Sequence, residues 1–286
     1  MKFAFIQGQA AHFPVALLCQ VFGVSRSGYY AWRTREPSAR TMRQAKLVAQ
    51  IRAEHEASRA SYGSPRIQEA LVAQGTKCSV NTIAKLMREH GIRSKMARKF
   101  RVATTDSAHP HPIAANVLNQ EFTRERINEV WVADITYIPT REGWLYLAAV
   151  LDLCSRKVVG WATADHLRAE LACRALQNAL DVRQPSGPLL HHSDRGVQYA
   201  CDDYQSLLRL NGLTPSMSRT GNCYDNAVME SFFGSLKMEL VHHETYATRA
   251  QAHQSLFEYL EVFYNRQRLH SSLRYQSPHQ FELTLP

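Results

Sequence analysis

Three acidic residues occupy sequence contexts that predict a shared metal site. Asp134 lies in the strand-like segment WVADITYI, Asp194 follows a short apolar run in LLHHSDRGVQY, and Glu230 lies in the helical pattern DNAVMESFFGSLKMEL. Carboxylates from two strands and a helix form a cage of hard oxygen ligands that suits Mg²⁺ or Mn²⁺. Two such ions can clamp the attacking and leaving oxygens of a phosphodiester. The spacing therefore predicts two ions per site, held by these three acids, and a reaction that cuts and joins nucleic acid.

Each acid also has a local alternative. Asp134 could be a structural carboxylate satisfied by nearby hydrogen bonds, although an acid on a central strand is costly to bury unless it is paired or metal-bound. Asp194 could cap a turn, but ligands collect where strands end in open α/β sheets. Glu230 could belong to a solvated Glu–Lys helix face. Because the three contexts coincide in one chain, we favour a common catalytic role.

The helix expected around Glu230 separates a polar stripe from an apolar one. The polar stripe would present to DNA a metal ligand, a glycine that admits close approach, and a cation. We expect Asp225 to cap this helix, and Asn226, Lys237 and also Arg195 (next to Asp194) to contact DNA. The polar stripe is Asn226, Glu230, Gly234 and Lys237, and the apolar stripe that faces the core is Val228, Phe232, Leu236 and Leu240.

The charge of the chain is unevenly distributed. The net charge is +9 over 286 residues, and residues 1–101 alone contain 18 Lys and Arg against 5 Asp and Glu, a net of +13. The remaining residues contain 16 against 20, a net of −4. A basic front and a mildly acidic rear are typical of a nucleic-acid-binding module joined to a catalytic module that carries carboxylates. The alternative is a set of well-solvated basic helices.

The front of the chain contains two helical segments. In residues 1–36, a helix ends at Gly23 and Ser25 caps a second one, the pattern of a helix-turn-helix. In residues 41–101, a helical DNA-binding domain ends in a basic tail, and its helix after Ser79 exposes Lys85 and Arg88. An ordinary three-helix bundle is the alternative. The basic tail, which we expect to contact phosphates without reading sequence, contains Arg93, Lys95, Arg98, Lys99 and Arg101.

The rear of the chain changes from a linker, residues 102–122, to a strand-rich core, residues 123–245. Three strands in a meander followed by alternating helices and strands predict an α/β fold with a mixed sheet and flanking helices. This order is compatible with a ribonuclease-H-like fold, preceded by the small all-helical segments. Residues 246–286 are expected to form a C-terminal helix and a basic tail.

The six cysteines are scattered, without a close pair at metal-ligand spacing. This pattern favours a reducing compartment and argues against a zinc ribbon or a disulfide framework. The sequence has no signal pattern and no apolar run of membrane-spanning length. We therefore expect a cytoplasmic protein, associated with the nucleoid when it is bound to DNA, and no membrane partner.

The segments around the three acids resemble transposases of the insertion-sequence-3 family, in particular the OrfB-type catalytic subunit with its retroviral-integrase-like DDE core. Thirty-five residues separate Asp194 from Glu230, and Lys237 follows seven positions later, a specific pattern without departure at the acids. The resemblance extends to FPVALLCQVFGVSRSGYYAW at the front and YNRQRLHSSLRYQSP near the end, so it covers nearly the whole chain.

The resemblance implies a ribonuclease-H-like core, Mg²⁺ or Mn²⁺, and recognition of the terminal inverted repeats of an insertion element and of target DNA. It assigns Asp134, Asp194 and Glu230 as metal ligands and Lys237 as a contact near the scissile end. Pairing of two ends implies a homo-oligomer on DNA. The chain has no long heptad run, so an upstream OrfA-type protein is expected as a partner or as a fusion.

Two other classes of protein share some of these features. A metal-dependent nuclease of the same fold would carry the acids but would need no basic helical front. A DNA-binding repressor with an inactive core would bind DNA and would cut none. The intact trio of acids favours the transposase.

Overall fold

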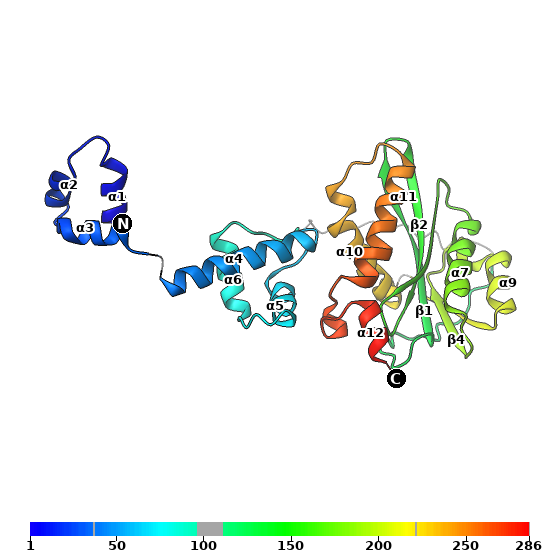
Figure 1. The fold of residues 1–286 in the computed structure, drawn as a ribbon. Helices are drawn as coiled ribbons and strands as arrows, with labels where there is room; N and C mark the ends of the chain where they lie inside the picture. The colour runs from blue at the N-terminus through cyan, green and yellow to red at the C-terminus, as the bar shows by residue number, and fades with distance from the viewer. Residues whose placement is uncertain (37, 96–110, 221, 286) are drawn as a thin grey trace. The chain divides into compact units, whose positions relative to one another are not determined.

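The computed structural model describes residues 1–36, 38–95, 111–220 and 222–285, and it divides the chain into two compact units, Met1–Ala53 and Glu54–Pro286 (Figure 1). None of the helices in the described residues combines the length and the apolar character that crossing a bilayer requires.

Within the first unit, α1 (Lys2–Gln9), α2 (Val15–Val21) and α3 (Arg26–Thr34) form a small helical bundle. The two expected helices are present, and α1 precedes them. Ser25 caps α3 as predicted, because its hydroxyl accepts the backbone N–H of Gly28 at 3.1 Å. The buried side chains that hold the bundle together are Ile6, Leu18, Cys19 and Tyr29.

Three helices precede the sheet: α4 (Ala39–Ala57), α5 (Ser64–Ala73) and α6 (Val80–Glu89). Gly75 follows the C-cap of α5, and its φ of +83° lies in the left-handed region that glycine adopts without strain. Ser79 then caps α6 by accepting the N–H of Thr82 at 3.2 Å. Two helices joined by this short turn form the unit expected for DNA binding.

The sheet has five strands in the order β3-β2-β1-β4-β5. The three long strands β1 (Val130–Thr140), β2 (Gly143–Asp152) and β3 (Val158–Ala164) form an antiparallel meander. The two short strands β4 (Leu189–Ser193) and β5 (Leu213–Met217) run parallel to β1. This mixed sheet with flanking helices confirms the predicted fold class.

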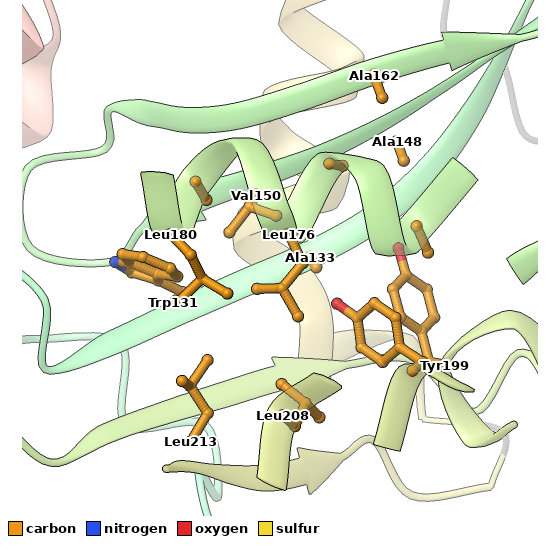
Figure 2. Packing of buried hydrophobic residues seen from close by; sticks show 14 of the residues in the cluster. Trp131, Ala133, Ala148, Val150, Ala162, Leu176, Leu180, Tyr199, Leu208 and Leu213 are labelled. Atoms are coloured by element: carbon orange, nitrogen blue, oxygen red, sulfur yellow. The ribbon is translucent and has the colours of Figure 1, made fainter. Parts of the chain in front are cut away.

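One face of the sheet is covered by α7 (Ala169–Arg183), with α8 (Val197–Ala200) and α9 (Asp202–Leu210) beside it (Figure 1). Trp131, Ala133 and Val150 from the strands pack against Leu176 and Leu180 of α7 (Figure 2). The chain breaks at Cys201, which separates α8 from α9.

β3 and α7 approach closely because residue 160 is a glycine. A Cβ at Gly160 would lie 2.6 Å from the Cβ of Ala179, and nearer still to the backbone of Ala175. No larger residue fits there unless the helix moves away from the sheet.

The opposite side of the sheet carries α10 (Ala227–Glu239) and α11 (Arg249–Phe257), which continues as a π-helical stretch, Glu258–Tyr264 (Figure 1). The segment expected to be a basic tail is folded. It contains a short 3₁₀ turn, Ser271–Leu273, and the helix α12 (Pro278–Thr284). α12 is fixed to the core because Glu282 pairs with Lys157 of the β2–β3 region at 2.8 Å and with Arg183 of α7.

Part of the segment expected to be a linker is also bound to the core. The backbone N–H groups of Val117 and Leu118 donate to the hydroxyl of Ser216 on β5, at 3.0 and 3.2 Å, and Leu118 is fully buried. The chain therefore joins the core at β5 before β1 begins.

Candidate catalytic site

The strand register places Asp134 and Asp194 side by side. β1 and β4 are parallel, and Val132 pairs with His192. Each acid lies two positions beyond its member of this pair, so the two lie level with each other on neighbouring strands, Asp194 just past the end of β4. Residues level with each other in parallel strands point to the same face. From the sequence we predicted that Asp134 lies inside a strand and that Asp194 follows the end of another. This register agrees with that prediction.

Asp134 shows the electrostatic cost of this arrangement. Burial raises the pKa of Asp134 well above its usual value, and the negative charges of Asp194 and Glu230 raise it further. The backbone N–H of Ile135, which donates to Asp134 Oδ1 at 2.7 Å, and the cation of Lys237 only partly offset these effects. Carboxylates that raise the pKa of a neighbour in this way stabilise a bound cation.

Glu230 lies in the first turn of α10, with its side chain exposed. Partial loss of solvent raises the pKa of Glu230, and its charge acts on Asp134. Lys237 follows two turns later, with its ammonium 4.8 Å from the centre of the Tyr137 ring. Burial lowers the pKa of Lys237, while Asp134 opposes this shift. α10 therefore brings an acid and a base to the same part of β1.

Asn226 joins α10 to β1 directly. The pairing of β1 with β4 ends at Val132, and the next carbonyl, that of Ala133, accepts the side-chain amide of Asn226 at 3.2 Å. Asn226 is 6% exposed and occupies the N-cap position of α10, and its buried Oδ1 has no hydrogen-bond partner in the part of the chain that the structure describes. From the sequence, Asn226 was predicted to contact DNA. In the structure, Asn226 fixes the start of α10.

The prediction that Asp225 caps this helix is wrong. Asp225 is fully buried and accepts hydrogen bonds from the Arg219 guanidinium, at 2.8 and 3.0 Å, and from the side-chain amide of Gln120 at 2.8 Å. The hydrogen bonds from Arg219 hold the pKa of Asp225 well below its usual value. A charged, two-pronged pair is stronger than a neutral cap, so the carboxylate turns to Arg219.

The loop after β4 is built around Asp194. The backbone N–H of Gly196 donates to Asp194 Oδ1 at 2.8 Å, and a Cβ at Gly196 would lie 3.0 Å from that oxygen. The Arg195 side chain donates to the carbonyl of Ser218 and, at 2.7 Å, to the hydroxyl of Thr220. Arg195, predicted to contact DNA, thus ties this loop to the segment that leads to α10.

Two further buried side chains lie near the acids. His192 bonds Ser216 and Ser218 at 2.9 and 3.2 Å, and burial lowers its pKa to about 4, so the ring is neutral at pH 7. Tyr199 is buried, and its hydroxyl has no hydrogen-bond partner among the described residues. Burial raises the pKa of Tyr199 well above its usual value, and the charges of Asp134 and Asp194 add to this shift. His192 had no predicted site role, whereas Tyr199, close after Asp194, was predicted from the sequence as a neighbour of DNA.

The predicted DNA contacts of the helical domain are surface residues. Lys85 and Arg88 are exposed on α6, and Lys85 lies 3.8 Å from Glu89. Arg93 is exposed and Lys95 half-buried just after α6. The other three cations of the predicted basic tail, Arg98, Lys99 and Arg101, lie outside the described residues.

The three acids do not form a closed cage. Within the described ranges, no group of three or more His, Cys, Asp or Glu side chains is close enough to hold a metal ion. The acids are neighbours that act on one another's charge, and their oxygens would have to converge to coordinate an ion.

Family comparisons agree with this arrangement of domains. Residues 124–223 and 230–284 each match an integrase core domain, and residues 39–100 match an HTH-like domain. Together with the mixed sheet, these matches define the chain as an integrase-type enzyme with a helical DNA-binding domain in front.

Individual relatives narrow the class to a family. The chain is 47% identical over 264 residues to an insertion element IS600 uncharacterized 31 kDa protein of Shigella sonnei, covering 92% of this chain and 97% of that one. It is 43% identical over 285 residues to transposase InsF for insertion sequence IS3A of Escherichia coli (strain K12), covering 99% and 98%. The chain therefore belongs to the insertion-sequence-3 family of transposases, as its motifs predicted, and is a polynucleotidyl transferase.

The chain also aligns with one chain of a solved structure, the simian T-cell lymphotropic virus intasome in complex with PP2A regulatory subunit B56 gamma, with a TM-score of 0.48 and 16% identity. The alignment covers 77% of this chain and 72% of the viral one.

Proposed function

We propose that Asp134, Asp194 and Glu230 are the catalytic acids of this transposase, which cuts DNA at the ends of its insertion element and joins those ends to target DNA. The observation that carries the proposal is the parallel register of β1 and β4, which sets Asp134 level with Asp194. The raised pKa of Asp134, caused by burial and by the charges of the other two acids, agrees with it. A half-buried carboxylate next to two further acids is unfavourable in the free protein. Such strain is typical of a functional site.

The chemistry of the donor set, three carboxylates and an amide oxygen, suits two divalent ions, Mg²⁺ or Mn²⁺, once these oxygens converge. Asp134 lies level with Asp194 and feels the charge of Glu230, so it is the acid that both ions would share. The neighbouring buried Oδ1 of Asn226, which lacks a donor, is another hard oxygen of the kind these ions prefer. Bound ions would activate a nucleophile and stabilise the leaving oxygen of a phosphodiester.

The proposed reaction has two steps, and the chain's own residues position the DNA for both. In the first step water attacks a phosphodiester at the element end and frees a 3′-hydroxyl. In the second step this hydroxyl attacks a phosphodiester of the target, so one bond forms for each that breaks and no external energy source is needed. Lys237, next to Asp134, would contact the phosphate near the scissile end and offset its charge.

The helical domain would supply most of the DNA affinity. We infer that Lys85 and Arg88 on α6, with Arg93 and Lys95 after it, contact the terminal inverted repeats. Synapsis of two ends requires a homo-oligomer on DNA. An upstream OrfA-type protein, as a partner or a fusion, would add to end recognition.

Cleavage of a duplex carrying the element end tests this function. Asp134→Asn should lower Mg²⁺-dependent nicking by several orders of magnitude and leave end binding roughly intact, whereas Asp181→Asn, on the exposed side of α7, should cut normally. Nicking that persists in Asp134→Asn would refute the assignment. Faster cleavage of an RNA–DNA hybrid than of the element end would indicate a nuclease instead.

A further inference from the structure

Tyr62, in the helical domain, is bonded to the C-terminal part of the chain. It precedes α5 and is 4% exposed. Its hydroxyl accepts the backbone N–H of Leu269 at 2.7 Å and donates to the carbonyl of Gln267 at 3.3 Å. Burial raises the pKa of Tyr62, so the hydroxyl keeps the proton that it donates. One side chain thus satisfies two backbone groups more than 200 positions away.

Arg66, one turn into α5, reaches the helix that carries Glu230. Its guanidinium lies 5.6 Å from the Tyr62 ring and 3.8 Å from Glu239 Oε1. Glu239 is the last residue of α10, nine positions after Glu230, which corresponds to about 13 Å along a helix. The helical domain therefore contacts the end of α10 opposite to the catalytic acid.

Glu239 is the centre of a buried polar cluster. The Arg268 guanidinium donates to its carboxylate at 2.6 and 2.8 Å, and the hydroxyl of Tyr259 donates at 2.8 Å. Glu239 and Arg268 are 7% and 4% exposed. Because Arg268 already neutralises Glu239, Arg66 adds a second cation to a paired site.

The contact combines opposing charges with an open cleft. Burial and the charge of Arg268 lower the pKa of Arg66, so Arg66 is attracted by Glu239 and repelled by Arg268 at once. A cleft of about 540 Å³, open to solvent, is lined by residues from both sides, among them Tyr62 and Gln267. The boundary between the two parts is therefore held by a few directed polar bonds beside a solvent-filled cleft.

We propose that Tyr62 and Arg66 form a docking surface that seats the helical domain on the Glu239–Arg268 pair of the same chain. The docked domain holds the C-terminal end of α10 while Asn226 holds its start, so DNA binding by the helical domain is coupled to the placement of Glu230. The docking itself stands on the contacts above. Only its consequence for Glu230 rests on the proposed function.

Amide hydrogen exchange of the full-length chain tests the docking without catalysis. Tyr62→Phe removes the acceptor of the Leu269 N–H, so exchange at Leu269 should rise by roughly tenfold, the effect of losing about one hydrogen bond. Amides of β1 should be unchanged, and the control Tyr30→Phe, a half-exposed tyrosine of the first unit, should alter neither. Equal exchange at Leu269 in wild type and Tyr62→Phe would overturn the proposal.

A second variant tests the contact with α10. Arg66→Ala should speed exchange at the end of α10, Leu236 to Glu239, whereas Arg52→Ala, an exposed arginine of α4, should not. Binding of an element-end duplex should change exchange at this end of α10 in the wild type. In the double variant of Tyr62→Phe and Arg66→Ala, binding should remain and this change should be lost. An identical change in both chains would disprove the coupling, even if Asp134 proves to be catalytic.

Discussion

Asn226 donates its side-chain amide to the carbonyl of Ala133, the first β1 residue beyond the pairing with β4. The residue after Ala133 is Asp134, and Asn226 is also the N-cap of the helix that carries Glu230. One hydrogen bond therefore fixes the start of α10 beside the strand that presents the central acid. The placement of Glu230 therefore depends on a residue that is itself almost fully buried.

Asn226→Ala should weaken catalysis more than binding. Loss of the bond to Ala133 should cost about 1 kcal/mol of folding free energy and let α10 shift, and a displacement of this kind lowers a rate by up to roughly a hundredfold. End cleavage and end binding of the variant should be compared with those of Asn178→Ala, which loses a similar amide bond to the Trp161 carbonyl. Equal cleavage by the two variants would show that Asn226 does not position the acids.

Asp134→Asn should stabilise the metal-free protein at neutral pH. The folded-state pKa of Asp134 is raised, so its contribution to stability is present at low pH and is lost as the pH rises through that pKa. In chelator at pH 8 the variant should melt at a higher temperature than the wild type. Mg²⁺ should raise the melting temperature of the wild type more than that of the variant. A wild type that melts above the variant in chelator would contradict this account.

Asp225→Asn should have the opposite dependence on pH. The pKa of Asp225 is depressed by Arg219, so this pair stabilises the fold above the unfolded-state pKa, about 4, and the contribution is lost as the pH falls below it. Between about pH 5 and about pH 7, the variant should melt at a lower temperature than the wild type. The difference between the two melting temperatures should shrink as the pH drops below about 4. As the control, the exposed Asp181→Asn should differ from the wild type by a small melting-temperature change that does not depend on pH. If the melting temperatures of Asp225→Asn and the wild type follow parallel curves against pH, the ion pair is excluded.

Gly160→Ala should destabilise the core. The added methyl would overlap the backbone of Ala175 and lie 2.6 Å from the Cβ of Ala179, so α7 must move off β3 at a cost of about 3 kcal/mol. Thermal unfolding measures this loss. Gly187→Ala is the matched control, because nothing lies within 4 Å of a Cβ at Gly187. A melting temperature equal to that of the control would mean that β3 and α7 are not in contact.

The sequence was most informative where local pattern and chemistry coincide. The three-stranded meander and the alternation of helices and strands after it were predicted from the sequence, and the parallel register of β1 and β4 sets Asp134 level with Asp194. That the three acids are catalytic stays a prediction, supported by the raised pKa of Asp134.

The misses share a physical cause. Asp225 was expected to cap a helix, and residues after Tyr264 to form a basic tail, because local propensity cannot show partners that are distant in the chain. Arg219 takes the carboxylate of Asp225, and Glu239 draws Arg268 into the core. A charged residue in a polar segment looks solvated until the fold provides its counter-ion.

The anchoring of Val117 to Ser216 on β5 sets a limit on how far the DNA-reading helices can travel. Twenty-two peptide units connect Lys95, the last described residue of the helical domain, to Val117. Fully extended, they reach at most on the order of 75 Å, about the length of two turns of duplex DNA. If the helical domain leaves its own core, Lys95 therefore stays within that distance of β5.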